Sequence, residues 1–134
     1  MAAKEIKIVS SMEKCFLDDK ISDKKEKNSF IMLRNEKLSF QVAYSFEKVY
    51  NALFEVELGG TLAKYASVKQ VVSVPVSYPV RNDTGCNSDC IRNTPGLYPD
   101  VIRPLHYNGK VRVVENQLHA LWVDIKLSDN TDIT

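Results

Sequence analysis

Long apolar runs are absent from this sequence. No stretch approaches the roughly 20 apolar residues that a membrane-spanning helix needs. The first ten residues contain no apolar core of the kind that signal peptides carry, and three of them are charged: Lys4, Glu5 and Lys7. These absences argue against a membrane partner and against secretion, so the sequence predicts a cytoplasmic location.

An excess of one charge sign is also lacking. The chain has 18 basic and 17 acidic residues, a net charge of +1 that produces no broad field around the protein. Proteins that bind nucleic acid usually present a basic patch or stripe. The one basic cluster, residues 20–27, also contains Asp23 and Glu26, which is typical of a solvated loop. We therefore expect no nucleic-acid partner.

Cysteine and histidine are scarce, with three and two residues respectively. Cys86 and Cys90 have a CxxxC spacing, but a structural zinc site normally needs a second pair of ligands. The remaining candidates are Cys15, His106 and His119. Residues 82–89 are rich in Asn and Asp, yet they lack the ligand spacing of a calcium loop. We interpret Cys86 and Cys90 as reduced thiols that air oxidation could bridge, and we expect no metal and no cofactor.

Catalytic motifs are missing as well. The sequence contains no nucleophile elbow, no convincing Ser/His/Asp arrangement and no glycine-rich phosphate loop, because Gly59–Gly60 indicates only a turn. His119 opens a predicted strand, where a packing role is the usual one. His106 lies in a loop, where it could meet a ligand. We expect this chain alone not to be an enzyme, and we assign no catalytic residue.

Alternation of apolar and polar residues is what the sequence offers instead. Apolar side chains recur at every second position from Leu38 to Phe46, which predicts a half-buried antiparallel strand. Residues 119–127 repeat the pattern. Weaker strands are predicted at residues 5–10, 30–33, 53–58, 68–78 and 111–114. Pro75 indicates an edge or a bulge, because proline cannot donate to a strand ladder. Seven strands predict one all-β domain over residues 1–134, an immunoglobulin-like antiparallel β-sandwich.

The connection from residue 79 to residue 110 is unusually long. It is rich in proline and glycine and shows no clear period. Loops this long are uncommon in compact domains and are usually functional or disordered. This one carries apolar anchors that disordered linkers lack, Ile91, Leu97, Tyr98, Val101, Ile102, Leu105 and Tyr107. We therefore predict one long ordered loop over residues 79–110, pinned to the sandwich or to a neighbour.

The sole tryptophan, Trp122, lies on the strand face opposite the stripe Leu121, Val123, Ile125 and Leu127. A sandwich strand has one core face, so Trp122 needs another cover. The long loop, a partner domain or a sugar could each supply that cover, since aromatic side chains are favoured at interfaces. The candidate docking or glycan-contact surface therefore combines Trp122 with residues of the loop: Arg92, Tyr98, His106 and Tyr107.

Four segments carry a family resemblance. They are Ser10–Phe16, Leu38–Tyr44, Asn93–Leu105 with the run TPGLYPDVIRPL, and Gln117–Ile125 with the run LWVDI. In this order they resemble the N-terminal domain of bacterial multidomain proteins of the glycoside hydrolase family 123-like group, which carry the uncharacterised domain 4091 as a later module. The resemblance spans almost the whole chain. The loop motif is fairly specific, and the strand motifs alone would be weak.

The resemblance implies a β-sandwich that precedes a (β/α)8-type catalytic barrel, so the catalytic acids would belong to the barrel. Members of the group usually continue through a proline-and-glycine turn into one more strand, whereas this sequence stops at residues 129–134. The resemblance thus implies the N-terminal part of a longer protein that lacks its final strand, either as a fragment or as a shortened gene product. An unpaired sheet edge would then favour a homodimer by strand addition.

Three functions follow as hypotheses. The first is a non-catalytic accessory domain that packs against the catalytic barrel of a parent glycosidase. The second is a stand-alone carbohydrate-binding or protein-interaction module, in which Trp122, Tyr98 or Tyr107 stacks on its ligand. The third is an independent small hydrolase, which no motif supports. We favour the first.

Overall fold

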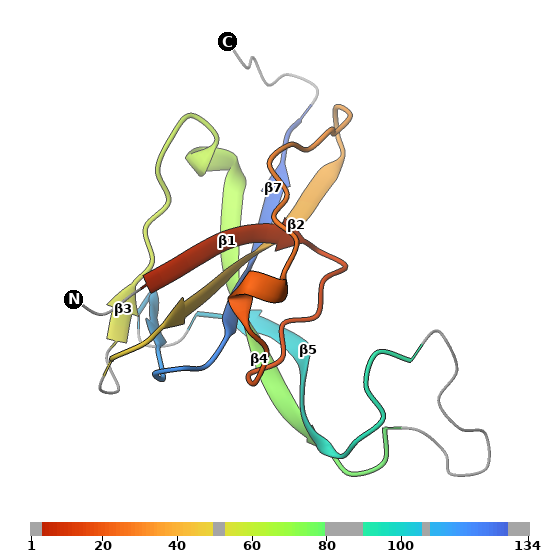
Figure 1. Cartoon of the computed structure of the whole chain (residues 1–134). Helices are drawn as coiled ribbons and strands as arrows, with labels where there is room; N and C mark the ends of the chain where they lie inside the picture. Colours follow the sequence, from red (N-terminus) through yellow and green to blue (C-terminus); the bar gives the residue numbers. More distant parts are fainter. Residues whose placement is uncertain (1–3, 50–52, 80–89, 106–107, 129–134) are drawn as a thin grey trace.

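The described residues of the chain form seven antiparallel strands and no α-helix (Figure 1). The computed structural model describes residues 4–49, 53–79, 90–105 and 108–128. The strands are β1 (Lys4–Ser10), β2 (Lys37–Phe46), β3 (Leu53–Glu55), β4 (Ala66–Val76), β5 (Gly96–Pro104), β6 (Lys110–Arg112) and β7 (His119–Lys126). Two single 3-10 turns are η1 (Ile21–Asp23) and η2 (Ala63–Tyr65). No helix in the described ranges is long and apolar enough to cross a membrane. The all-β prediction is confirmed.

The larger sheet has the order β1-β2-β7-β4-β5, and β3 pairs with β6 in a separate two-stranded sheet. The two strands with the clearest alternation, β2 and β7, lie side by side at the centre. Their register places Phe40 opposite Val123 and Leu38 opposite Ile125. Residues directly opposite each other in an antiparallel pair share a face. The two apolar stripes therefore merge into one continuous apolar face.

That apolar face carries most of the core. Val123, Ile125 and Leu127 are buried there, and the half-buried residues Leu38, Phe40 and Val68 pack against them. Toward the other end, Tyr44 packs with Val111 and Val113, which lie in and just beyond β6. The β3–β6 pair thus covers one end of the apolar face, which gives the domain its two-layered, sandwich-like character. The finer immunoglobulin-like assignment stays a prediction.

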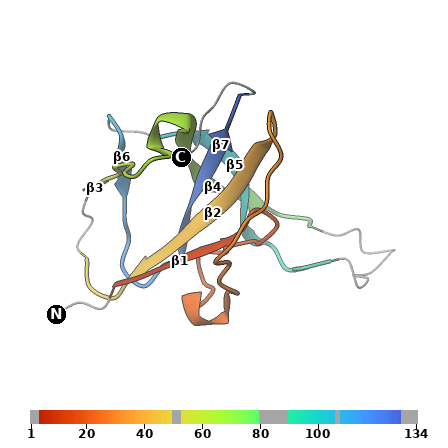
Figure 2. The same ribbon diagram turned by 90° about the horizontal axis from the view of Figure 1, so that it is seen from above.

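The opposite face is half covered by the N-terminal segment, residues 11–27, which contains η1. Cys15 and Ile21 from this segment are buried against Val9, Ala43 and Ala120 of the sheet. The side chain of Lys7 in β1 holds this segment in place, because its Nζ donates to the carbonyl oxygens of Ile21 and Lys24, each at 3.0 Å. Figure 2 shows η1 on a different side of the sheet from β3 and β6.

One strand and one loop differ from the sequence prediction. Residues 79–110 are not a single loop, because Gly96–Pro104 forms the edge strand β5. The register shifts between Val72 and Ser73, so that Asp100 is an extra residue on β5. This bulge interrupts the alternation, and Pro99 and Pro104 hide the strand signal further, since prolines are tolerated in edge strands. Conversely, residues 30–33 form no strand.

The predicted position of Pro75 is confirmed. Beyond Gln70, β4 pairs with β5 alone, and Pro75 follows the bulge by two residues. This end of the β4–β5 ribbon extends away from the rest of the sheet (Figure 1). The last strand, β7, is paired with β2 on one side and β4 on the other. The expectation of an open edge therefore does not apply to β7, and the edges of the larger sheet are β1 and β5.

Candidate functional site

Trp122 is tied to the sheet by a buried carboxylate. Its indole Nε1 donates a hydrogen bond of 2.9 Å to Oδ1 of Asp124, two residues further along β7. Ser39 on the neighbouring strand donates its hydroxyl to the same oxygen at 2.5 Å. Residues two apart on a strand share a face, so the alternation of β7 itself brings the indole and the carboxylate together. Trp122 is half-buried.

Lysines surround this carboxylate. Lys69 Nζ lies 3.6 Å from Oδ2 of Asp124, and Lys37 Nζ lies 4.0 Å from Oδ1. Burial acts to raise the pKa of Asp124, but the hydrogen bonds from Ser39 and Trp122, with the two lysines, outweigh it and hold the pKa below its usual range. Asp124 is therefore ionised and fully engaged at neutral pH, which makes it a structural group and a poor proton donor.

The strand register extends this arrangement into a surface that we call the Trp122 face. Lys37 lies directly opposite Lys126, and Asp124 lies between Ser39 and Ser67 on its two neighbouring strands. Trp122 lies opposite Lys69. The Trp122 face thus comprises Lys37, Ser39, Ser67, Lys69, Trp122, Asp124 and Lys126. It is the part of the second sheet face that lies beyond the N-terminal segment.

A small hollow adjoins the indole ring. Trp122, Val71 and Ile102 supply its apolar wall, and Lys14 and Asp100 supply its polar rim. Lys14 spans the hollow from the N-terminal segment, because its Nζ lies 3.4 Å from Oδ1 of Asp100 and 3.3 Å from the carbonyl oxygen of Pro99. The bulge at Asp100 turns this carboxylate toward Lys14, so the hollow closes between β5 and the N-terminal segment.

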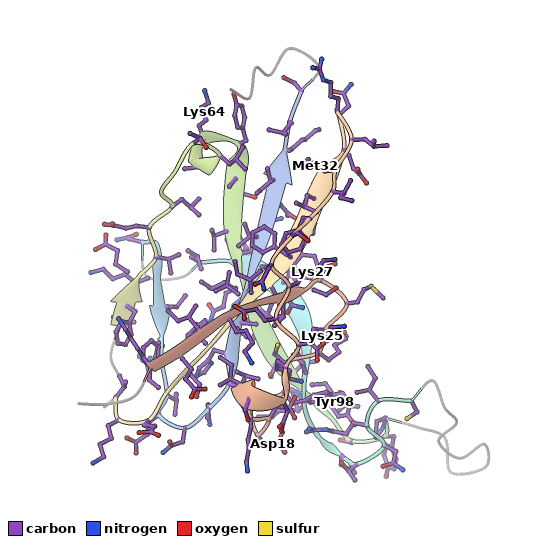
Figure 3. The ribbon with its side chains drawn as sticks, turned by 45° about the horizontal axis from the view of Figure 1, so that its top comes forward. Asp18, Lys25, Lys27, Met32, Lys64 and Tyr98 are labelled. Atoms are coloured by element: carbon purple, nitrogen blue, oxygen red, sulfur yellow. The ribbon has the colours of Figure 1, made fainter. Side chains whose placement is uncertain are left out.

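A second cluster joins Arg92 and Tyr98 around Phe16. The guanidinium carbon of Arg92 lies 3.6 Å from the centroid of the Phe16 ring, and Tyr98 meets the same ring edge-to-face at 5.3 Å. Arg92 also donates to Asp18 at 2.8 Å and to Asp19 at 3.2 Å. The hydrogen bond from Arg92 lowers the pKa of Asp18. Figure 3 shows Asp18 and Tyr98 at the same end of the molecule.

The hydroxyl of Tyr98 is engaged within the chain. It lies 2.7 Å from the carbonyl oxygen of Thr94 and 3.1 Å from that of Arg92. These contacts close the loop over residues 92–98 and fix the ring against Phe16. Tyr98 therefore acts as an anchor for this loop. Because its ring is half-buried, it exposes less aromatic surface for stacking on a ligand than a free ring would.

The predicted site residues come together in part. The hollow beside Trp122 and the one beside Arg92 and Tyr98 share Lys14, Pro99 and Asp100. Trp122 and Tyr98 thus line two neighbouring hollows that the Lys14–Asp100 pair separates. His106 and Tyr107 lie outside the described residues. His119 has the predicted packing role, because it stacks on Tyr44 with ring centroids 5.5 Å apart.

The interpretation of the cysteines needs one correction. Cys90 is disulfide-bonded, whereas reduced thiols were expected. The CxxxC spacing alone does not separate a bridge from two thiols. Cys15 is free and buried, and burial raises the pKa of its thiol to about 11. Among the described residues, no group of His, Cys, Asp and Glu could hold a metal ion.

Sequence reasoning missed Lys37 and Lys69. The alternation of residues 119–127 already places Trp122, Asp124 and Lys126 on one face. Lys37 and Lys69 join them only through the pairing register of β2 and β4 with β7. Register between distant strands is a tertiary property that no local pattern reports. In the sequence, Lys37 only precedes a predicted strand and Lys69 lies in a weakly predicted one, so neither could be assigned to the face of Trp122.

Comparison with known proteins yields a structural match alone. No family model matches the chain, and no curated protein matches it. Among solved structures, the fold is similar to part of a family 123 glycoside hydrolase from Clostridium perfringens, studied for glycolipid glycan hydrolysis, with a TM-score of 0.65 and 13% sequence identity. The alignment covers 96% of this chain and 22% of that chain. This chain therefore has the fold of a small part of a larger hydrolase.

Proposed function

We propose that this chain is a non-catalytic accessory domain that packs against the catalytic domain of a larger glycoside hydrolase. The observation that carries the proposal is the unequal coverage of the structural match. Nearly all of this chain superposes on about a fifth of the family 123 enzyme. A fold that occurs as a fraction of an enzyme is best explained as one of its domains.

The chemistry of the described residues supports the same conclusion. The buried carboxylate, Asp124, is held by two hydrogen bonds and two lysines. Asp18 and Asp19 are paired with Arg92, and Asp100 with Lys14. A glycosidase needs two carboxyl groups that flank an open cleft, one of them protonated at neutral pH. These carboxylates instead stabilise the fold and its loops.

Co-expression tests the proposal. The chain would be produced together with the coding region that follows it in its gene, and the two products separated by size-exclusion chromatography. We expect an equimolar complex that survives dilution to micromolar concentration. Co-expression with an unrelated barrel domain is the control. Separate elution of the two products, or the absence of any following coding region, would contradict the proposal.

A stand-alone glycan-binding module is the competing function. The half-buried Trp122 on a sheet face is the observation that favours it. Glycan binding that disappears in the variant Trp122→Ala, while the circular dichroism spectrum is unchanged, would replace the accessory proposal. We expect no such binding, because the indole N–H is already used by Asp124.

A further inference from the structure

We propose that the Trp122 face docks onto an acidic surface of the catalytic domain. This inference rests on the proposed function and assigns the interaction to one surface. The other face of this sheet is occupied by the core. The Trp122 face is aromatic at the end next to the N-terminal segment, and lysines lie along the rest of it. Protein interfaces commonly combine an apolar region with polar residues around it.

The apolar end of the Trp122 face is continuous across three strands. Trp122 of β7 lines the same hollow as Val71 of β4 and Ile102 of β5, which is itself opposite Val71. Ile102 keeps 42% of its surface exposed, and Trp122 is half-buried. Tryptophan is enriched among the residues that dominate binding energy, particularly where surrounding groups exclude water.

The charge of the Trp122 face specifies the chemistry of its partner. The Trp122 face carries three lysines and one carboxylate. Lys37 and Lys69 lie within 4.0 Å of this carboxylate, which already accepts hydrogen bonds from Ser39 and Trp122. Lys37 and Lys126 lie directly opposite each other, an arrangement of like charges that destabilises an isolated sheet. No ion pair to Lys126 occurs among the described residues. Acidic groups on a partner would relieve this repulsion.

The same chemistry argues against a neutral sugar as the occupant. Sugar hydroxyls need acceptors as well as donors, and a lysine ammonium group only donates. The described carboxylate of the Trp122 face is buried and its oxygens are engaged, and the indole N–H is used internally. What the Trp122 face presents to a ligand is cationic donors beside an apolar ring. An acidic protein surface satisfies both features.

The position of the sole tryptophan provides a direct probe. Trp122 is the only tryptophan of the chain and is part of the Trp122 face, opposite Lys69, so its fluorescence reports binding there. We would titrate the protein with a ten-residue glutamate peptide at low ionic strength. We expect a saturable change in emission that weakens at least fivefold when salt is raised, because salt screens exposed charges.

Charge reversal identifies the lysines responsible. The variant Lys37→Glu/Lys126→Glu should lose at least tenfold in affinity for the peptide, and Lys37→Gln/Lys126→Gln should lose less. The matched control Lys4→Glu/Lys25→Glu changes the net charge equally at two exposed lysines outside the Trp122 face and should bind as the wild type does. Unchanged thermal unfolding would show that each variant is folded. Equal binding by both reversed variants would overturn the proposal.

The co-expressed complex separates this inference from the function on which it rests. Dissociation of the complex in Lys37→Glu/Lys126→Glu, but not in Lys4→Glu/Lys25→Glu, supports docking through the Trp122 face. A complex that tolerates both reversals overturns the inference and leaves the accessory function standing. If an anionic oligosaccharide binds the Trp122 face and the glutamate peptide does not, the partner is a glycan and the inference fails.

Discussion

The side-chain amide of Gln41 lies 2.6 Å from the carbonyl oxygen of Glu13, so a buried group on β2 holds the N-terminal segment against the sheet. The same Nε2 lies 3.1 Å from the carbonyl oxygen of Ser10 and 3.3 Å from that of Ser11. Gln41 is 3% exposed. The amide thus meets three carbonyl oxygens of a tight turn, one of which, that of Ser10, also accepts from the backbone N–H of Glu13.

Replacing Gln41 by leucine should destabilise the fold. The substitution keeps most of the side-chain volume but leaves the half-buried carbonyl oxygen of Glu13 without this donor, at a cost of about 1–3 kcal/mol. Urea unfolding followed by Trp122 fluorescence measures the change. Ser45→Ala, on the same face of β2, is the control and should cost much less. Equal stability of Gln41→Leu and the wild type would mean that the turn is held by other contacts.

The alternation of β2 and β7 made both strands predictable, because the large apolar side chains of each strand line the same face of the sheet. Residues 30–33 are a short run of four apolar residues, but there Phe30 packs against Phe40 and Met32 packs against the core without any strand ladder. A short apolar run therefore indicates burial and does not by itself indicate hydrogen bonding to a neighbouring strand. Backbone pairing depends on partners distant in sequence.

The candidate site shows the same contrast between features that local sequence predicts and features that depend on distant contacts. Trp122 could be singled out because it interrupts the simple rule that a strand has one apolar face. The roles of Tyr98 and Arg92 could not, because both depend on Phe16, which is more than 70 residues away in the sequence. Their contacts arise only when β5 is paired and the N-terminal segment is folded across the sheet. Tertiary packing decides such roles.

Neutralising Asp124 should cost stability at neutral pH. In Asp124→Asn, the hydrogen bonds from Ser39 and Trp122 lose their charged acceptor and two lysines lose their counter-charge, with an expected loss of about 1.5–3 kcal/mol. The pKa of Asp124 is lowered from 3.8 in the folded state. Its stabilising contribution is therefore present above pH 3.8 and is lost as the pH falls through the lowered pKa.

Urea unfolding of wild type and Asp124→Asn at several pH values tests this expectation. The difference in unfolding free energy should be largest near neutral pH and should shrink in strong acid, where the wild-type carboxyl is protonated as well. Asp100→Asn is the control, because Asp100 is exposed and its ion pair with Lys14 is worth little. A difference that does not vary with pH would show that the loss is one of packing.

His119 should make the domain sensitive to mild acid. Burial lowers the pKa of its imidazole from 6.5, and Nε2 accepts a hydrogen bond of 3.3 Å from the backbone N–H of Val114. Protonation would remove this acceptor. Because the folded pKa is depressed, the unfolded state binds the proton first, so stability is full above pH 6.5 and declines as the pH falls below it.

Thermal unfolding between about pH 7.5 and about pH 5.5 measures this effect, since histidine is the side chain that titrates in this range. We expect the melting temperature to fall as the pH is lowered, and we expect His119→Gln to lose most of that dependence. His106→Gln is the control for the other histidine and should keep it. A pH dependence that survives in His119→Gln would assign the effect to another group.

The thiol of Cys15 should be unreactive until the domain unfolds. Its side chain is packed with Ile21, Val9 and Leu118, and burial raises its pKa to about 11, so the reactive thiolate is scarce at neutral pH. Labelling with a thiol-specific chromogenic reagent should be at least about 100-fold slower for the native protein than for the protein in denaturant. Cys15→Ser, which cannot be labelled at this position, is the control. Rapid labelling of the native thiol would mean that the N-terminal segment opens readily from the sheet, and Gln41→Leu should then label faster still.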